Sequence, residues 1–291
     1  MEALPNVNAL ANVEEDKLLK LWEGLGYYNR VRNMQKAARQ IMVDYNGTFP
    51  ETYEEIQSLT GIGNYTAGAI SSFSFGLPYP AVDGNVLRVA ARLNDDFTPI
   101  TDVKQKKRTT GHFSEITPED RPGDFNQSLM ELGATVCLPN GAPRCGSCPV
   151  QHLCLGYHHG HAEILPVRAA KRARRIEERT VLLVRCGEEV GIRRRPKTGL
   201  LAGLWELPSL EGRTGANELR ARLSARGWQV EKLLSLRGAK HVFTHVEWHM
   251  SGFEVTLAEK PEGLTFVTPQ ALRESYALPS AFRAFLSVLE E

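Results

Sequence analysis

Four of the five cysteines in this 291-residue chain lie in one short segment, which is the pattern with the clearest chemistry. Four thiolates spaced between positions 137 and 154 can hold a [4Fe–4S] cluster or a structural zinc ion. Zinc sites of this type usually have two close cysteine pairs, whereas only one such pair is present here. The sequence therefore predicts a metal or cluster site, with zinc as the alternative occupant. The predicted ligands are Cys137, Cys145, Cys148 and Cys154.

The run LTGIGNYTA, from Leu59 to Ala67, is a second segment whose residue types suit a function. Thr52 and Glu55 fit a capping box that begins a short helix before it, and another helix is expected from about Tyr65 to Phe75. The glycines allow a tight hairpin whose exposed backbone N–H groups suit a phosphate, although a plain connecting turn is the alternative. We predict a helix-hairpin-helix that binds a DNA backbone without reading its sequence. Its contacts would be made by Gly61, Gly63 and Thr66.

The elements expected around these motifs change in type midway along the chain. Apolar residues at helical spacing predict a helix that ends at Asn46 and Gly47, and no strand is expected before the cysteines. Later segments are predicted as strands at 180–184, 191–194 and 249–256, and as helices at 269–276 and 280–289. We therefore expect an all-α domain over 1–157, a basic linker over 158–178 and a small α/β domain over 179–291.

The overall composition neither indicates nor excludes a nucleic-acid partner. The formal net charge is +1, and the basic runs at 104–108 and 171–175 are equally well explained as solvated faces. No apolar stretch approaches the roughly 20 residues of a membrane-spanning helix, and the N-terminus does not resemble a signal peptide. We expect a protein of the cytoplasm that does not contact the membrane.

The order of the motifs resembles a known group of enzymes. A helix-hairpin-helix, then the run AVDGNV at residues 81–86, then a late four-cysteine segment is similar to the endonuclease III superfamily of DNA glycosylases. The resemblance implies that Asp83 is catalytic and that the cysteines hold a [4Fe–4S] cluster. The spacing between the first two cysteines is one residue longer than is usual in that superfamily.

Further features resemble the adenine DNA glycosylases of the MutY type. Tyr65 stands where strand-cleaving members have a Schiff-base lysine, so the resemblance implies a monofunctional enzyme. The run at 21–33 resembles the family's GLGYY signature, in which Tyr27 would wedge into the duplex and Leu25 would contact DNA. The run at 199–208 resembles the family's nudix-like C-terminal domain, where an oxidised guanine is read. The residues implied in that reading are Phe243, Thr244 and His245.

The resemblance implies a fold, a reaction and a substrate. The fold would be an all-α helix-hairpin-helix domain with an iron–sulfur loop, followed by a nudix-like α/β domain. The reaction would be hydrolysis of the N-glycosidic bond of adenine paired with 8-oxoguanine or guanine in double-stranded DNA, by a monomer that associates with the nucleoid if bacterial. Asp83 would stabilise the oxocarbenium-like sugar, while Tyr65 and Asn85 would line the site.

Two other activities are disfavoured by the sequence, and the acid expected to protonate adenine is not found in it. A nudix hydrolase is disfavoured because Gly227 stands where its essential glutamate should be, and a thymine or uracil mismatch glycosylase is disfavoured by the second domain. The family's adenine-protonating acid lies in a helix that would precede Pro5, so we expect it upstream of Met1 and assign it to neither Glu14 nor Glu15. A lesion-binding fragment or pseudoenzyme is therefore the alternative function.

Overall fold

The computed structural model describes residues 2–169 and 173–289, and the chain divides into two compact units. One unit combines Met1–Gln35 with Arg172–Glu291, and the other is Lys36–Lys171. The division falls inside helix α3, which spans Asn29–Asp44.

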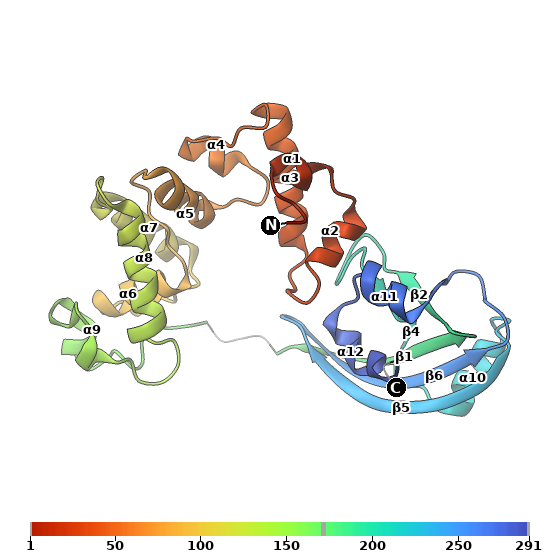
Figure 1. Cartoon of the computed structure of the whole chain (residues 1–291). Helices are drawn as coiled ribbons and strands as arrows, with labels where there is room; N and C mark the ends of the chain where they lie inside the picture. The colour runs from red at the N-terminus through yellow and green to blue at the C-terminus, as the bar shows by residue number, and fades with distance from the viewer. Residues whose placement is uncertain (1, 170–172, 290–291) are drawn as a thin grey trace. The chain divides into compact units, whose positions relative to one another are not determined.

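In its described residues, the second unit consists of helices joined by loops and turns (Figure 1). Asn46 and Gly47 both have left-handed φ values, +52° and +80°, which ends α3 at the predicted position. A π-helical turn follows α8, two 3₁₀ turns lie in the cysteine segment, and the expectation of no strand before the cysteines is confirmed. The helices after α3 are α4 (Tyr53–Ser58), α5 (Asn64–Phe75), α6 (Gly84–Leu93), α7 (Val103–Ile116), α8 (Pro122–Glu131) and α9 (Leu155–His158).

The first unit contains a seven-stranded mixed sheet whose central path is β3-β2-β1-β6-β5. β1 runs parallel to β6 and antiparallel to β2 and β4, and β7 pairs with β2. The three predicted strands lie within β1, β2 and β6, whereas β5 was not expected because its burial does not alternate. The strands are β1 (Arg175–Cys186), β2 (Glu189–Arg194), β3 (Trp205–Glu206), β4 (Ser209–Glu211), β5 (Val230–Val242), β6 (Val246–Leu257) and β7 (Thr265–Val267).

Helices cover both faces of this sheet. Successive side chains of a strand point to opposite faces, so residues 181–184 of β1 contribute alternately to two cores. Leu272 of α11 and Phe285 of α12 cover one core, while Leu219 of α10 covers the other. Figure 1 shows α11 and α12 lying over the same face of the sheet. These helices are α10 (Ala216–Ser224), α11 (Pro269–Ser275) and α12 (Arg283–Leu286), with short 3₁₀ turns at Ser280–Phe282 and Ser287–Leu289.

The N-terminal helices α1 (Val7–Asn12) and α2 (Glu15–Leu21) belong to the sheet unit. Leu18 is buried in one core with Leu204 and Ala277. Arg32 donates to the Ala202 carbonyl at 2.7 Å, and the Leu278 N–H donates to the Glu23 carboxylate at 2.8 Å. Residues 1–35 of the domain expected over 1–157 therefore pack with the sheet unit. Helical spacing shows which face of a short helix is apolar, but it does not show which surface will cover that face.

The expected linker also contains part of the sheet. β1 begins at Arg175, so the linker predicted over 158–178 ends earlier than its composition indicated. Residues 170–172 of that segment, which include part of the second basic run, lie outside the described residues. Within the described ranges, no helix is long and apolar enough to cross a membrane.

Candidate active site and cysteine site

Asp83 is the N-cap of α6, and its carboxylate accepts three hydrogen bonds. Oδ1 accepts from the backbone N–H groups of Asn85 and Val86 at 2.7 and 2.8 Å, and Oδ2 accepts from the Asn85 side-chain amide at 2.9 Å. A carboxylate has about four acceptor positions, so one remains for an outside partner. The helix terminus adds a positive potential that favours the anion. The local sequence Asp-Gly-Asn thus fixes a carboxylate at a half-buried position.

Arg88 links this cap to the cysteine segment. Its side chain, only 3% exposed, donates to the Asn85 amide oxygen at 2.9 Å, to the Gly133 carbonyl at 2.5 Å and to the Cys137 carbonyl at 2.8 Å. Burial lowers the pKa of its guanidinium, while the neighbouring Cys137 raises it. Sequence reasoning missed Arg88, since nothing in its spacing separates it from an exposed helix residue.

Gly68 brings α5 against the segment that leads to Asp83. A Cβ atom at Gly68 would lie 2.0 Å from the Pro80 carbonyl oxygen, so only glycine allows this approach. Residues three apart share a helix face, which puts Tyr65 on the same side of α5 as this contact. Tyr65 is 44% exposed, in agreement with a position open to substrate.

Buried Asn126 of α8 holds the same segment in place. Its amide oxygen accepts from the Ala81 N–H at 2.9 Å, and its amide nitrogen donates to the Ser72 hydroxyl and the Tyr79 carbonyl, both at 2.9 Å. Three segments thereby meet at one side chain, two residues before Asp83. This clamp too was absent from the sequence prediction.

We expect Asn126→Ala to destabilise the helical unit by about 1–3 kcal/mol or more, because each buried group left without a partner costs about that amount. Far-UV circular dichroism during urea unfolding would measure the loss. All four tryptophans, at positions 22, 205, 228 and 248, lie in the sheet unit. Their fluorescence is therefore an internal control, and an unchanged circular-dichroism midpoint would contradict the clamp.

The predicted helix-hairpin-helix has the expected elements, with α4 and α5 joined by residues 59–63. Gly61 has φ +84°, which a residue with a side chain rarely adopts. Gly63 is the N-cap of α5 and has no side chain to accept from the first N–H groups of that helix. Those donors are therefore directed outward, as an anion site requires. Thr66 lies in the first turn of α5 and is half-buried.

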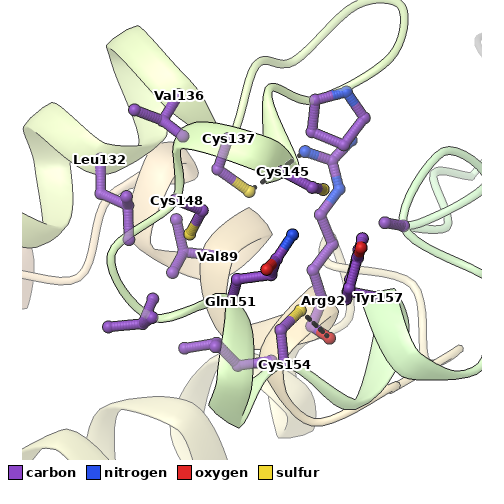
Figure 2. Close-up of a pocket in the computed structure, with 14 residues that line it drawn as sticks. Val89, Arg92, Leu132, Val136, Cys137, Cys145, Cys148, Gln151, Cys154 and Tyr157 are labelled. Atoms are coloured by element: carbon purple, nitrogen blue, oxygen red, sulfur yellow. Dashed lines mark hydrogen bonds between the residues drawn. The ribbon is translucent and has the colours of Figure 1, made fainter.

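The four clustered cysteines line one pocket (Figure 2). Arg92 lies beside it, donates to the Cys137 sulfur at 3.1 Å and accepts from the Cys154 thiol through its own carbonyl at 3.4 Å. The rest of the lining is mostly apolar. It includes Val89, Leu93, Leu132, Val136, Pro143 and Val150.

The four thiols gathered at this pocket supply the donor set of a [4Fe–4S] cluster, with zinc as the alternative occupant. Burial, and then the neighbouring thiols, raise the pKa of Cys145. Burial likewise raises the pKa of Cys154, so binding here must release protons.

The loop of residues 24–28, here called the tyrosine loop, and the Phe243–His245 turn line one cavity within the sheet unit. Its volume is about 810 Å³, within the roughly 300–1,000 Å³ typical of ligand pockets. Tyr27 and Leu25 are 74% and 66% exposed at its wall, and Tyr27 has a strained φ of +46°. Burial lowers the pKa of His241, which also lines the cavity and was not predicted.

In the Phe243–His245 turn, Phe243 is held by packing, whereas the other two residues are exposed. The Phe243 ring packs edge-on against His241 and Trp248, with centroids 4.6 and 4.9 Å apart. The Phe243 N–H donates to the Val246 carbonyl at 2.8 Å, which closes the β5–β6 connection. Thr244 and His245 are exposed and free to contact a ligand.

Comparison with known proteins agrees with this architecture. The profile of the HhH-GPD superfamily of base excision DNA repair proteins matches residues 1–119, and that of the NUDIX domain matches residues 180–288. The protein named adenine DNA glycosylase in Rattus norvegicus is 30% identical over all of this chain and 67% of its own length. Its namesake in Buchnera aphidicola subsp. Baizongia pistaciae is 30% identical over 86% of this chain and 70% of its own length.

The chain belongs to the adenine DNA glycosylase family. The predicted order of a helix-hairpin-helix domain and a nudix-like α/β domain is confirmed. A further member, from Mus musculus, is 32% identical over 90% of this chain, which spans 60% of the mouse protein's length. Membership gives the family, while the activity, the substrate and the reaction of this chain are inferred from its own site.

Proposed function

We propose that this protein is a monofunctional adenine DNA glycosylase of base excision repair, which hydrolyses the N-glycosidic bond of adenine opposite 8-oxoguanine or guanine. The observation that carries the proposal is the Asp83 carboxylate, fixed at the start of α6 with one acceptor position free. A cation forming at the deoxyribose would be stabilised there. Tyr65 has a phenol and no amine, so no Schiff base forms and the strand stays intact.

Each group in the helical unit has a separate task in this scheme. The free N–H groups after Gly63 bind a backbone phosphate, which positions the duplex without reading its sequence. The target adenine leaves the stack, at a cost of a few kcal/mol, before its bond to deoxyribose breaks. Asn85, held by Asp83 and Arg88, lines the same site and orients the sugar or the attacking water. We assign the proton that adenine receives to none of the described carboxylates.

The sheet unit would recognise the base that is paired with the target adenine. The cavity between the tyrosine loop and the Phe243–His245 turn is large enough for a base, and two exposed residues of that turn offer polar atoms. The lowered pKa of His241 favours its neutral form, which can donate or accept without adding charge. We propose that 8-oxoguanine is recognised here, in double-stranded DNA, by a monomer in the cytoplasm.

The four cysteines are proposed to hold a [4Fe–4S] cluster. When bound, the cluster supplies four metal–thiolate bonds that cross-link residues 137–154. Arg92 and Arg88 then connect this loop to α6, whose N-cap is Asp83.

Cys148→Ala should remove most of the iron and the visible absorption of the purified protein, because three thiolates do not complete the site. Iron and sulfide analysis after anaerobic reconstitution would measure this loss. The matched control is Cys186→Ala, which lies in β1 of the sheet unit and should bind iron as the unaltered chain does. Equal iron in both variants would contradict the assignment.

The first test of function is single-turnover adenine release from a duplex with adenine opposite 8-oxoguanine. Duplexes with adenine opposite guanine and opposite thymine are compared, and binding is recorded in parallel. Release from the first two, with no strand break, is the expected result. Selective binding without release would instead favour the alternative, a lesion-binding protein that lacks catalysis. Equal binding to all three duplexes would exclude lesion recognition altogether.

Tyr27→Ala should weaken binding to the 8-oxoguanine duplex at least about tenfold, since an inserted aromatic ring stacks on bases at about 1–3 kcal/mol. Its 74% exposure means that stability should hardly change. Fluorescence anisotropy measures binding and thermal unfolding measures stability. Tyr157→Ala is the control, a 42% exposed tyrosine beside the cysteine pocket, and it should not alter discrimination between the duplexes.

A further inference from the structure

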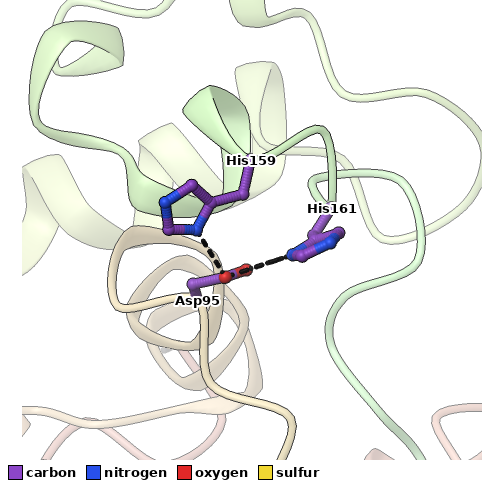
Figure 3. Close-up of side chains that lie close together, drawn as sticks. All are labelled: Asp95, His159 and His161. Atoms are coloured by element: carbon purple, nitrogen blue, oxygen red, sulfur yellow. Dashed lines mark hydrogen bonds and ion pairs between the residues drawn. The ribbon is translucent and has the colours of Figure 1, made fainter.

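Asp95, His159 and His161 form a cluster that the proposed glycosylase reaction does not use (Figure 3). The His159 Nδ1 atom lies 2.8 Å from one carboxylate oxygen of Asp95, and the His161 Nδ1 atom lies 2.9 Å from the other. All three ligand atoms lie within 4.8 Å of one another, and this is the one such group found in the described residues. It brings together two segments 64 residues apart in sequence.

The backbone fixes each of the three residues. Asp95 directly follows the C-cap of α6, and its left-handed φ of +54° turns its side chain away from the helix path. The His161 N–H donates to the Gly156 carbonyl at 2.7 Å, which holds the turn after α9. The Phe97 ring meets the His161 ring edge-on at 5.1 Å and restricts its rotation.

The donor set is suited to a transition metal ion. We propose that Asp95, His159 and His161 bind Zn²⁺ through one carboxylate oxygen and two imidazole nitrogens. Two imidazoles and a carboxylate are borderline ligands that suit zinc better than magnesium or calcium. Three protein ligands leave the fourth tetrahedral position to water.

The surroundings allow such an ion to enter. Asp95 is 15% exposed, while the two imidazoles are 53% and 38% exposed, so one side of the group faces solvent. Asp95 also lines a cavity of about 520 Å³ with Asp96, Arg108 and His112, which has room for a water ligand. Arg108 pairs with Asp96, which leaves the charge of Asp95 for the two histidines and the ion.

Metal binding would require a change of tautomer. Without metal, the contact of each Nδ1 atom with the Asp95 carboxylate requires a proton on Nδ1, because the carboxylate only accepts. With zinc bound, both Nδ1 lone pairs face the ion, so each proton moves to Nε2 of the same ring and no net charge is lost. The ion would tie the residues after the cysteine segment to the end of α6. The site would therefore anchor the outer flank of the cysteine loop, independently of any glycosylase activity.

Cobalt titration of the full chain tests the site, because Co²⁺ replaces Zn²⁺ and reports its ligands by colour. We expect visible bands of nitrogen and oxygen ligation, without the intense sulfur-to-metal charge transfer that the cysteines would give, and displacement of the bands by Zn²⁺. The double variant H159Q/H161Q should bind at least about tenfold more weakly, since loss of even an outer hydrogen bond to a metal ligand costs 10–100-fold. The control H152Q/H158Q removes two exposed histidines of the same segment and should bind normally.

A second variant and a second measurement guard against misfolding. Asp95→Asn keeps hydrogen-bonding atoms toward both histidines but removes the charge, so it should fold and bind Zn²⁺ weakly. Zn²⁺ should raise the thermal midpoint of the natural chain and of H152Q/H158Q, but not that of Asp95→Asn. The proposal is overturned if Co²⁺ gives only thiolate bands, or if H159Q/H161Q and Asp95→Asn bind both ions as tightly as the natural chain.

Discussion

Asp83→Asn should slow adenine release at least about 100-fold while the protein keeps most of its stability. Asparagine is as good an N-cap as aspartate, so the bonds to the N–H groups of Asn85 and Val86 survive, and only the bond from the Asn85 side-chain amide is lost. The negative charge beside the developing sugar cation is lost, and removal of one preorganised electrostatic partner typically costs about 10²–10³ in rate. Single-turnover release from the 8-oxoguanine duplex measures the effect, and unfolding by circular dichroism measures stability.

Asp83→Ala separates the two roles of this carboxylate. It should lose the same activity and also about 0.5–2 kcal/mol of stability, because the cap itself is removed. Duplex binding should persist in both variants, since the phosphate contacts come from the hairpin. If Asp83→Asn released adenine at the rate of the natural chain, the carboxylate would be a structural cap alone.

Arg88→Met should destabilise the helical unit by about 3 kcal/mol or more. Methionine fills the volume of the arginine stem but leaves the acceptors of Asn85, Gly133 and Cys137 without a donor. Each such buried group costs about 1–3 kcal/mol. Because Asn85 and the cysteine segment lose their common partner, iron content and adenine release should fall together.

Arg88→Met is measured in the same way as Asn126→Ala, by urea unfolding followed with two probes. Urea unfolding by circular dichroism should shift, while tryptophan fluorescence, which reports the sheet unit, should not. The control is Arg222→Met in α10, where the arginine is 50% exposed and pairs with Glu218. An exposed pair of this kind contributes about 0.3–0.5 kcal/mol. Similar small effects in both variants would show that the Arg88 contacts do not hold the unit together.

Local sequence was sufficient wherever a short-range interaction decides the structure. The capping residue Thr52, the turn at Asn46 and Gly47 and the hairpin glycines each act within a few residues, and each appears where the pattern predicted it. The β-rich run at 180–184 likewise predicted the core of β1, and the segment at 191–194 predicted its hairpin partner β2. The four cysteines are close in sequence, so their meeting at one pocket requires little of the fold.

The order of the motifs along the chain was also sufficient to predict the family. The spacing from hairpin to aspartate to cysteines places Asp83, Tyr65 and the thiols in the helical unit, and the NUDIX match begins within two residues of the predicted domain start at 179. The roles of these residues stay predictions, since they depend on a bound duplex.

Other features were decided only by tertiary structure. Residues 7–21 form two short helices, yet the surface that buries Leu18 comes from residues near 204 and 277, which no local pattern can specify. Arg88 and Asn126 have polar side chains that would be solvated on an isolated helix, and packing alone buries them among backbone acceptors. The Asp95 site also depends on tertiary structure, because Asp95 and His159 are 64 residues apart in sequence. Its ligands are unremarkable in sequence and become a site because α6 ends beside the turn after α9, where three donor atoms converge.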